Sequence, residues 1–259
     1  MQKMPLGEHV RRYVLFFTSV LMQGLGIALI TLAHIGTTPI SSTNFVISLH
    51  TPLTLGDTTM IFNVLLVILQ IMIVNRKILE HWLNIVMQVP VILMFSWMID
   101  FAMSNIEILL PEILPYWLAW ALVILGTVIL AFSIACSFVA SVCMVPGEYF
   151  IKVFHPLVNR SFSYVKTFFD IFLVSCAIVI SLFLTGFSAV EGVREGTLFA
   201  ALITGPMVHL FIPLVMHINP LLQGTQTVAK NKVQQSLDKE TAAVLKKEAS
   251  KTKNTSEKI

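Results

Sequence analysis

The feature that most constrains this chain is a series of long apolar stretches that are almost free of charge. An apolar stretch of about 20 residues can cross the hydrocarbon core of a bilayer as one α-helix. Only 12% of all residues are charged, about half the share that is usual in a soluble domain. The chain therefore predicts an all-α integral membrane protein. We assign six spans, to residues 13–35, 59–74, 82–103, 116–140, 166–185 and 196–217.

The basic residues are distributed unevenly between the segments that connect these spans. If six helices alternate in direction, all of the 17 Lys and Arg residues except Arg194 fall on one side. Cytoplasmic segments of membrane proteins carry an excess of Lys and Arg. We therefore predict that both termini are cytoplasmic.

The ends of the chain differ in composition from its body. Residues 1–12 are a short predicted cytoplasmic N-terminus, and residues 218–259 are a basic cytoplasmic tail. Residues 224–259 hold eight of the 17 basic and four of the 14 acidic residues. So polar a segment cannot bury enough apolar surface to fold, and we expect it to be largely disordered. Nothing in it indicates nucleic-acid recognition.

Two connections, residues 37–57 and 145–164, share an outline. Each contains a proline, Pro39 or Pro146, followed by an apolar run. The fixed φ of proline suits the first turn of a helix. We therefore expect a short helix after span 1 and another after span 4, each lying at the interface or dipping part-way into the membrane.

The two halves of the chain align with each other at an offset of 107 residues. Small residues, a proline and an amide or acid position coincide without a gap. The paired positions are Ala33 with Ala140, Pro39 with Pro146, Asn63 with Asp170 and, with two more residues of offset, Asp100 with His209.

This alignment predicts two three-helix repeats, residues 13–103 and 116–217, joined by an external linker at residues 104–115. Because three is an odd number, the second repeat must enter the membrane from the opposite side. Inverted repeats are common in secondary transporters, whose binding site lies between the halves near mid-membrane.

Small residues and prolines mark the expected helix contacts and hinges. Without a hydrophobic drive between helices in lipid, close backbone approach over small residues holds them together. The Gly205-Pro206 pair in span 6 permits a kink that is either a hinge or a static bend. The residues assigned to packing or hinges are Gly24, Gly26, Ala28, Gly36, Pro146, Gly205 and Pro206.

Several polar residues lie in or beside the spans and need an explanation. A charged side chain at mid-membrane costs at least about 2.5–3.5 kcal/mol and so needs a partner or a purpose. Our candidates for contact with a solute or a coupling ion are Pro39, Ser41, Asn63, Asp100, Glu148, Asp170 and His209.

Each ionisable candidate also has a structural interpretation. Asp100 and Asp170 lie near span ends, where a carboxylate can reach water. Glu148 could cap the first turn of the second short helix, whose dipole favours negative charge. His209 could be a neutral, hydrogen-bonded packing residue, or a group that titrates near neutral pH.

Motifs for catalysis and metal binding are missing from the sequence. It has no P-loop, no HExxH and no GxSxG pattern. Its three cysteines form no CxxC pair. We therefore predict no catalytic residues, no metal site, no cofactor and no enzymatic activity.

Four short motifs resemble the YczE/YyaS/YitT family of bacterial integral membrane proteins. They are GLGIAL at 24–29, AHIGTTP at 33–39, REGT at 194–197 and LITGP at 202–206. The resemblance extends from about residue 11 to residue 217 and implies a six-helix protein of the bacterial cytoplasmic (inner) membrane. In that family the first-half proline is often followed by Trp-Asp, whereas Ile40 and Ser41 stand here. The related position in the second half keeps an acid, Glu148.

From these features we expect a secondary transporter or permease that moves a small solute through a site between inverted repeats. The alternative is a non-transporting scaffold or regulatory subunit that presents its basic tail. The expected partners are the lipid bilayer and a small solute, with a homo-oligomer left open.

Overall fold

The computed structural model describes residues 6–74, 78–160 and 162–217. The predicted tail, residues 218–259, lies outside them, as do residues 1–5. The described residues form eight α-helices and no strand. The helices are α1 Leu6–Leu32, α2 Pro39–His50, α3 Leu55–Val74, α4 Ile78–Glu107, α5 Tyr116–Ala140, α6 Pro146–Phe154, α7 Phe162–Leu184 and α8 Glu195–Met216.

The long and short helices follow the pattern expected from the sequence. Within the described residues, six helices are long and apolar enough to cross a membrane: α1, α3, α4, α5, α7 and α8. The remaining two, α2 and α6, are short and follow α1 and α5. The all-α class, the six spans and the two additional helices are thus confirmed.

Several helix ends lie outside the predicted apolar limits. Helix α1 begins at Leu6 rather than at residue 13, and α3 begins at Leu55 rather than at residue 59. In α3 the earlier start has a visible cause, because the Asp100 side chain accepts a hydrogen bond from the Gly56 N–H at 2.7 Å. A helix end is thus set by capping as well as by hydropathy.

Residues 12–216 form one compact unit, and residues 1–11 and 217–259 are grouped as a second one. Of the second unit, the described part is the first turns of α1 and His217.

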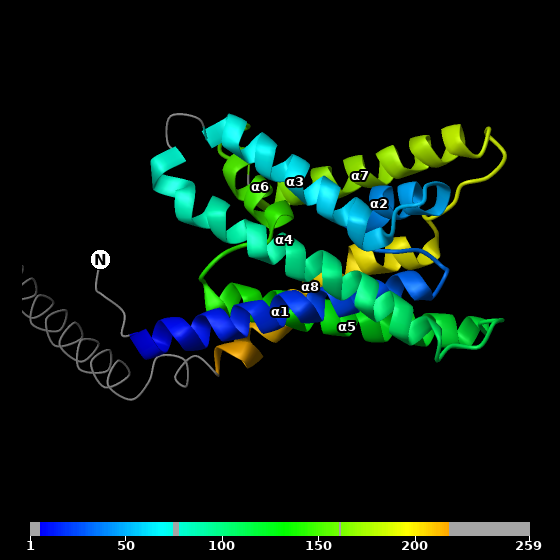
Figure 1. Ribbon diagram of the computed structural model, residues 1–259, viewed down its shortest axis with the longest axis horizontal. Coiled ribbons are helices and arrows are strands. Elements are labelled where there is room, and N and C mark those ends of the chain that lie inside the picture. The colour runs from blue at the N-terminus through cyan, green and yellow to red at the C-terminus, as the bar shows by residue number, and fades with distance from the viewer. Residues whose placement is uncertain (1–5, 75–77, 161, 218–259) are drawn as a thin grey trace, which may run out of the picture. The chain divides into compact units, whose positions relative to one another are not determined.

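Helices α1 and α5 cross at two glycines, and Figure 1 shows them side by side. A Cβ atom on Gly26 would lie 2.9 Å from the Gly126 carbonyl oxygen, and one on Gly126 would lie 2.7 Å from the Gly26 oxygen. At these distances a residue larger than glycine would fit only if one of the two helices moved. The two backbones therefore touch here, as expected for small residues between membrane helices.

The short helices lie against long helices of the other half of the chain. Helix α2 packs against α7 and α3, and α6 packs against α3 and α7. Helix α5 packs on α8, and α3 on α4. The hydroxyl of Thr43 in α2 donates to the Leu173 carbonyl of α7 at 2.9 Å. Each short helix is thus held by elements from both halves.

The short helices are preceded by two junctions with similar backbones. We call residues 33–38 the first junction and residues 141–145 the second junction. His34 has φ 55° and Ser141 has φ 52°, so both adopt the left-handed conformation that ends many helices. Helices α2 and α6 then begin at Pro39 and Pro146. Both pairs of positions are 107 residues apart, the offset of the sequence alignment.

Helix α8 continues through Pro206 and Pro213 without interruption. Gly205 lies exposed on it, and an added Cβ would meet nothing within 4 Å. The Gly205-Pro206 pair is thus on an open helix surface and not at a close helix contact.

Candidate functional site

A pocket of about 240 Å³ lies where α5 ends and α6 begins. We call it the α5–α6 pocket. Its walls come from the last turn of α5, the second junction, the first two turns of α6 and Asn84 of α4. Polar and ionisable side chains in the lining include Asn84, Ser137, Cys143, Glu148, Tyr149 and Lys152.

Local sequence explains why the chain turns here. Ser141 adopts the left-handed conformation and its N–H donates to the Ser137 carbonyl at 3.3 Å, which ends α5. Val145 is extended, as the residue before a proline prefers. Pro146 then opens α6 and places Glu148 in its first turn. The carboxyl group is thus near the positive end of the α6 dipole.

Glu148 is the acidic group of the pocket. No residue in the described part of the chain makes a hydrogen bond or a close ion pair with its side chain. Burial raises the pKa of Glu148 from 4.5 to about 7, and the more distant charge of Lys166 partly opposes that rise. Glu148 can therefore change its protonation state near neutral pH.

Burial changes the pKa of two further groups of the pocket, Tyr149 and Cys143. Tyr149 is only 1% exposed and hydrogen-bonds to the Asn84 side chain; burial raises its pKa. Burial also raises the pKa of the Cys143 thiol to about 11. The thiol lies 3.8 Å from the Asn84 carbonyl oxygen. These groups are neutral at physiological pH and form the inner wall.

Lys152 supplies a positive charge at the rim of the pocket. It is exposed, and its Nζ lies 6.0 Å from the centre of the Tyr149 ring. Lys152 and Glu148 are four residues apart on α6, so they are on one helix face. The pocket thus holds a carboxyl group inside and an ammonium group one turn further along.

Behind the pocket, α6 is tied to the membrane helices by a chain of amides. Gln70 of α3 donates through Nε2 to the Pro146 carbonyl at 2.8 Å, and Gln88 of α4 donates to Gln70 Oε1 at 2.9 Å. Both glutamines are fully buried. Gln70 was not among the predicted site residues. An amide within an otherwise apolar span was the signal that could have identified it.

Several buried polar atoms on the spans make no hydrogen bond. Among the described residues they include Gln23 Nε2, Thr59 Oγ1, Gln88 Oε1 and Ser96 Oγ. Unpaired polar groups at membrane depth are costly, and of these residues Gln88 belongs to the amide chain.

The structure brings some of the predicted site residues together. Asp170 forms an ion pair with Lys166 on α7, with Nζ 2.8 Å from Oδ2. Because Lys166 acts electrostatically on Glu148, Glu148, Lys166 and Asp170 form one electrostatic group. Pro146 belongs to the same region through its carbonyl group.

Other predicted residues lie elsewhere. Asp100 accepts hydrogen bonds from the Gly56 N–H and the Thr54 hydroxyl, both at 2.7 Å, and so caps α3. It is 16 residues from Asn84 along α4, or about 24 Å. Asn63 is buried on α3, whereas His209 is exposed on α8. His209 and Asp100 are thus not part of the pocket.

The residues predicted around the first short helix lie buried and paired. Pro39 opens α2, and the Thr38 hydroxyl donates to Ser41 Oγ at 3.0 Å. Gly36, at φ 129°, leaves room for the Thr197 side chain. Gly24 approaches α4, where an added Cβ would lie 3.1 Å from the Phe95 oxygen, and Ala28 is fully buried.

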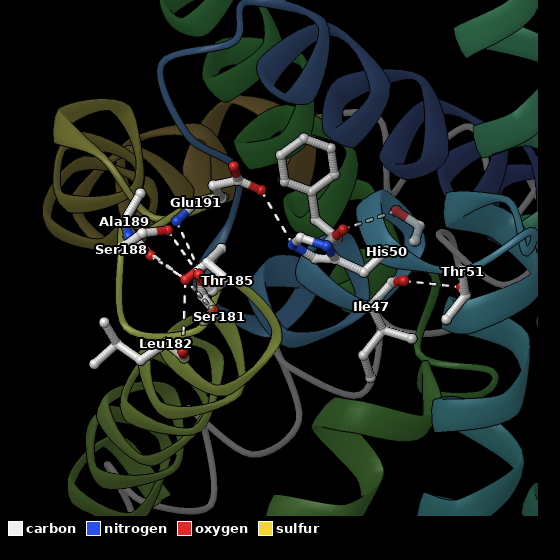
Figure 2. A network of polar contacts seen from close by, with 11 residues as sticks. Ile47, His50, Thr51, Ser181, Leu182, Thr185, Ser188, Ala189 and Glu191 are labelled. Atoms are coloured by element: carbon white, nitrogen blue, oxygen red, sulfur yellow. Dashed lines mark hydrogen bonds and ion pairs between the residues drawn. The ribbon is translucent and has the colours of Figure 1, made fainter.

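A polar network holds the far end of α2. His50 Nε2 lies 3.1 Å from Glu191 Oε2, and the Glu191 N–H donates to Ser181 Oγ at 2.7 Å (Figure 2). The last turn of α2 is thereby tied to α7 and to the connection between α7 and α8. Within the described residues, no cluster of three His, Cys, Asp or Glu side chains could hold a metal ion.

Comparison with known families places this six-span helical protein in a defined group. Residues 10–213 match the family described as "Family of unknown function (DUF6198)". Because the match covers most of the chain, the protein belongs to this family. Comparison with curated proteins and with solved structures finds no match.

Proposed function

We propose that this protein is a secondary transporter or permease-like protein for a small solute, and that the α5–α6 pocket is the open end of its solute path. The two parts that alternate are residues 13–103 and 116–217, as oppositely oriented repeats. The equal spacing of the two left-handed residues and of the two proline-initiated helices supports this arrangement. In secondary transporters the site lies at the interface of the repeats, and α2 and α6 each contact helices of both halves.

One observation carries the proposal. The second junction borders a pocket, whereas the first junction is filled by the start of α8, where Thr197 Oγ1 accepts from the Thr37 N–H at 3.1 Å. Two similar junctions, one open and one closed, are what a transporter needs in order to expose its site to one side at a time.

The charge distribution assigns sides to these junctions. We infer that both termini are cytoplasmic in a bacterial inner membrane, because Lys and Arg gather on that side. The pocket then opens to the cytoplasm. We also retain the resemblance to the YczE/YyaS/YitT family as a proposal, since its motifs at 33–39 and 194–197 coincide with the closed junction.

The test is uptake into proteoliposomes. Purified protein would be reconstituted and supplied with a small-metabolite extract, and the retained solutes would be compared by mass spectrometry with those of protein-free vesicles. We expect at least one solute to accumulate, and Glu148→Gln to lower its uptake at least about tenfold, the effect of losing a charged contact. Glu112→Gln, an exposed carboxyl outside the pocket, is the matched control. Uptake equal to that of empty vesicles for every solute would overturn the proposal.

A further inference from the structure

The charged groups of the α5–α6 pocket define which ligand it suits. Glu148 and Lys152 both line the pocket. They are on one face of α6, where side chains four residues apart have Cβ atoms about 5–6 Å from each other. Within the described part of the chain, neither forms an ion pair closer than 4.0 Å with the other or with a third group. The pocket thus presents two opposite charges that do not neutralise each other directly.

A third group points to a ligand. Ser137 lines the pocket and is only 3% exposed. Its hydroxyl makes no hydrogen bond with any described residue. Its oxygen is not among the enclosed polar atoms that lack a partner, so it faces the open space of the pocket. A polar ligand that reaches the end of α5 would hydrogen-bond to it there.

From this arrangement we propose, building on the proposed function, that the pocket binds a small zwitterion of the α-amino acid type. Its ammonium group lies against the Glu148 carboxylate, and its carboxylate lies against Lys152. A ligand with a single charge would contact only one of these two groups and would form only one of the two charge-assisted hydrogen bonds. The volume of about 240 Å³ is below the roughly 300–1,000 Å³ of pockets for drug-sized ligands, so the ligand is small.

Protonation of Glu148 should compete with this ligand. The groups around Glu148 are Lys152 and Tyr149 on α6, Cys143 in the second junction, the Lys166–Asp170 pair on α7 and the Gln70 amide on α3. None of them donates a hydrogen bond to the carboxyl group in the described structure. A ligand ammonium that takes this place favours the ionised form, so binding near pH 7 should release a proton. The same site would then exchange a proton for a solute.

Calorimetry on the purified full-length protein tests the ligand class. Glycine, alanine and serine at millimolar concentration are the zwitterionic probes, and ethylamine and propionate carry one charge each. We expect binding of at least one zwitterion, with ethylamine and propionate at least about tenfold weaker. Glu148→Gln and Lys152→Gln should each lower the affinity at least about tenfold. Glu112→Gln, outside the pocket, should leave it unchanged.

Repeating the titration in two buffers of different ionisation enthalpy gives the proton release. A release that is present in wild type and lost in Glu148→Gln supports competition at that carboxyl group. Propionate binding as tightly as alanine and resisting Glu148→Gln would identify an anion site and overturn the proposal. If ethylamine binds as tightly as alanine and its affinity is unchanged by Lys152→Gln, the pocket is a cation site, and the proposal is likewise overturned. Absence of binding by all zwitterions would also reject it.

The calorimetric result is separable from the transport result. Zwitterion binding without uptake would leave the ligand class standing and reject transport. Uptake of some other solute without zwitterion binding would leave transport standing and reject the ligand class. Unfolding midpoints of each variant show whether a loss of affinity reflects a loss of fold.

Discussion

The two junctions start from similar backbones and end in different surroundings. At the first junction, the start of α8 fits against the chain: the Gly196 N–H donates to the Ile35 carbonyl at 2.8 Å, and Thr31 and Thr37 share a hydrogen bond of 2.7 Å. At the second junction, Cys143 borders the open α5–α6 pocket, together with Ser137 in the last turn of α5. Similar local structure therefore leads to a closed site in one place and an open one in the other.

One pair of aligned residues shows why. Gly36 of the first junction corresponds to Cys143 of the second at the 107-residue offset. A Cβ on Gly36 would lie 2.5 Å from Thr197 Oγ1, so the closed junction requires glycine. At the second junction a thiol fits, with Sγ 3.8 Å from the Asn84 carbonyl oxygen. Contact with the start of α8 thus excludes a side chain at the first junction, whereas the contact with α4 at the second junction accommodates a thiol.

The largest effect is expected when a side chain is added at the closed junction. Gly36→Ala combines a clash with Thr197 and a φ of 129° that favours glycine. We expect it to lower the free energy of unfolding by about 3 kcal/mol or more, measured by denaturant titration in detergent. Gly186→Ala is the comparison variant, because Gly186 has φ 63° and an added Cβ meets nothing within 4 Å, so the left-handed backbone alone should cost about 1–2 kcal/mol. Equal losses in both variants would show that contact with α8 adds nothing to the need for glycine.

Thiol chemistry at the open junction should give the next largest effect. With its pKa raised from 9.0 to about 11 by burial, Cys143 should react with maleimide about a hundredfold more slowly at pH 7 than an ordinary thiol, because only the thiolate reacts. The rate should rise about tenfold per pH unit up to that pKa. The reaction is measured in protein whose other two cysteines are replaced by Cys136→Ser and Cys176→Ser. The comparison protein carries the same two substitutions together with Cys143→Ser and Ser141→Cys, which places an exposed thiol beside the pocket.

The reaction also reports on the pocket itself. If Cys143 stays unreactive at alkaline pH while the thiol of Ser141→Cys is modified, the second junction is closed in solution and the contrast between the junctions disappears.

A smaller effect is expected from the pH dependence of stability. Because the folded-state pKa of Glu148 is raised from 4.5 to about 7, the folded protein holds this proton more tightly than the unfolded chain. The contribution of Glu148 to stability should therefore be fully present below pH 4.5 and be lost as the pH rises through 7, by on the order of 1–2 kcal/mol for a half-buried carboxyl group. Thermal unfolding across this range measures it.

Glu148→Gln should remove that part of the pH dependence, and Glu112→Gln should keep it. A pH profile that is the same in wild type and Glu148→Gln would show that the carboxyl group is solvated and ordinary, which would remove the electrostatic contrast between the two junctions.

The smallest effects concern the arginines that cap the helices before each junction. Arg12 donates to the Val139 and Ala140 carbonyls at 3.2 and 3.3 Å, and Arg194 donates to the His34 carbonyl at 3.2 Å. Arg12→Ala should lower the free energy of unfolding by about 1 kcal/mol and Arg194→Ala by about 0.5 kcal/mol, because Arg194 is exposed and makes one such bond. Denaturant titration of both variants compares them. The reverse order would show that the closed junction depends more on its capping arginine than the open one does.

Particular residues show how far the site could be predicted. Glu148 was selected because an acid follows Pro146-Gly147, and the pocket contains it. The start of α6 was predictable because proline acts on its own neighbours. Gln70 was missed and His209 was chosen, although Gln70 binds the Pro146 carbonyl and His209 is exposed. The sequence does not show which face of a span packs against another helix, and that information was needed to choose between Gln70 and His209.

The sequence by itself determined the six spans, the two short helices and their starting prolines, because hydrophobic length and proline geometry are local properties. It could not determine which faces of the spans pack together. In a soluble helix an apolar stripe marks the buried face, but lipid is as apolar as a protein core, so large apolar side chains such as Leu202 and Leu210 lie exposed on α8. Tertiary structure alone therefore decided that α8 closes the first junction while the second borders a pocket.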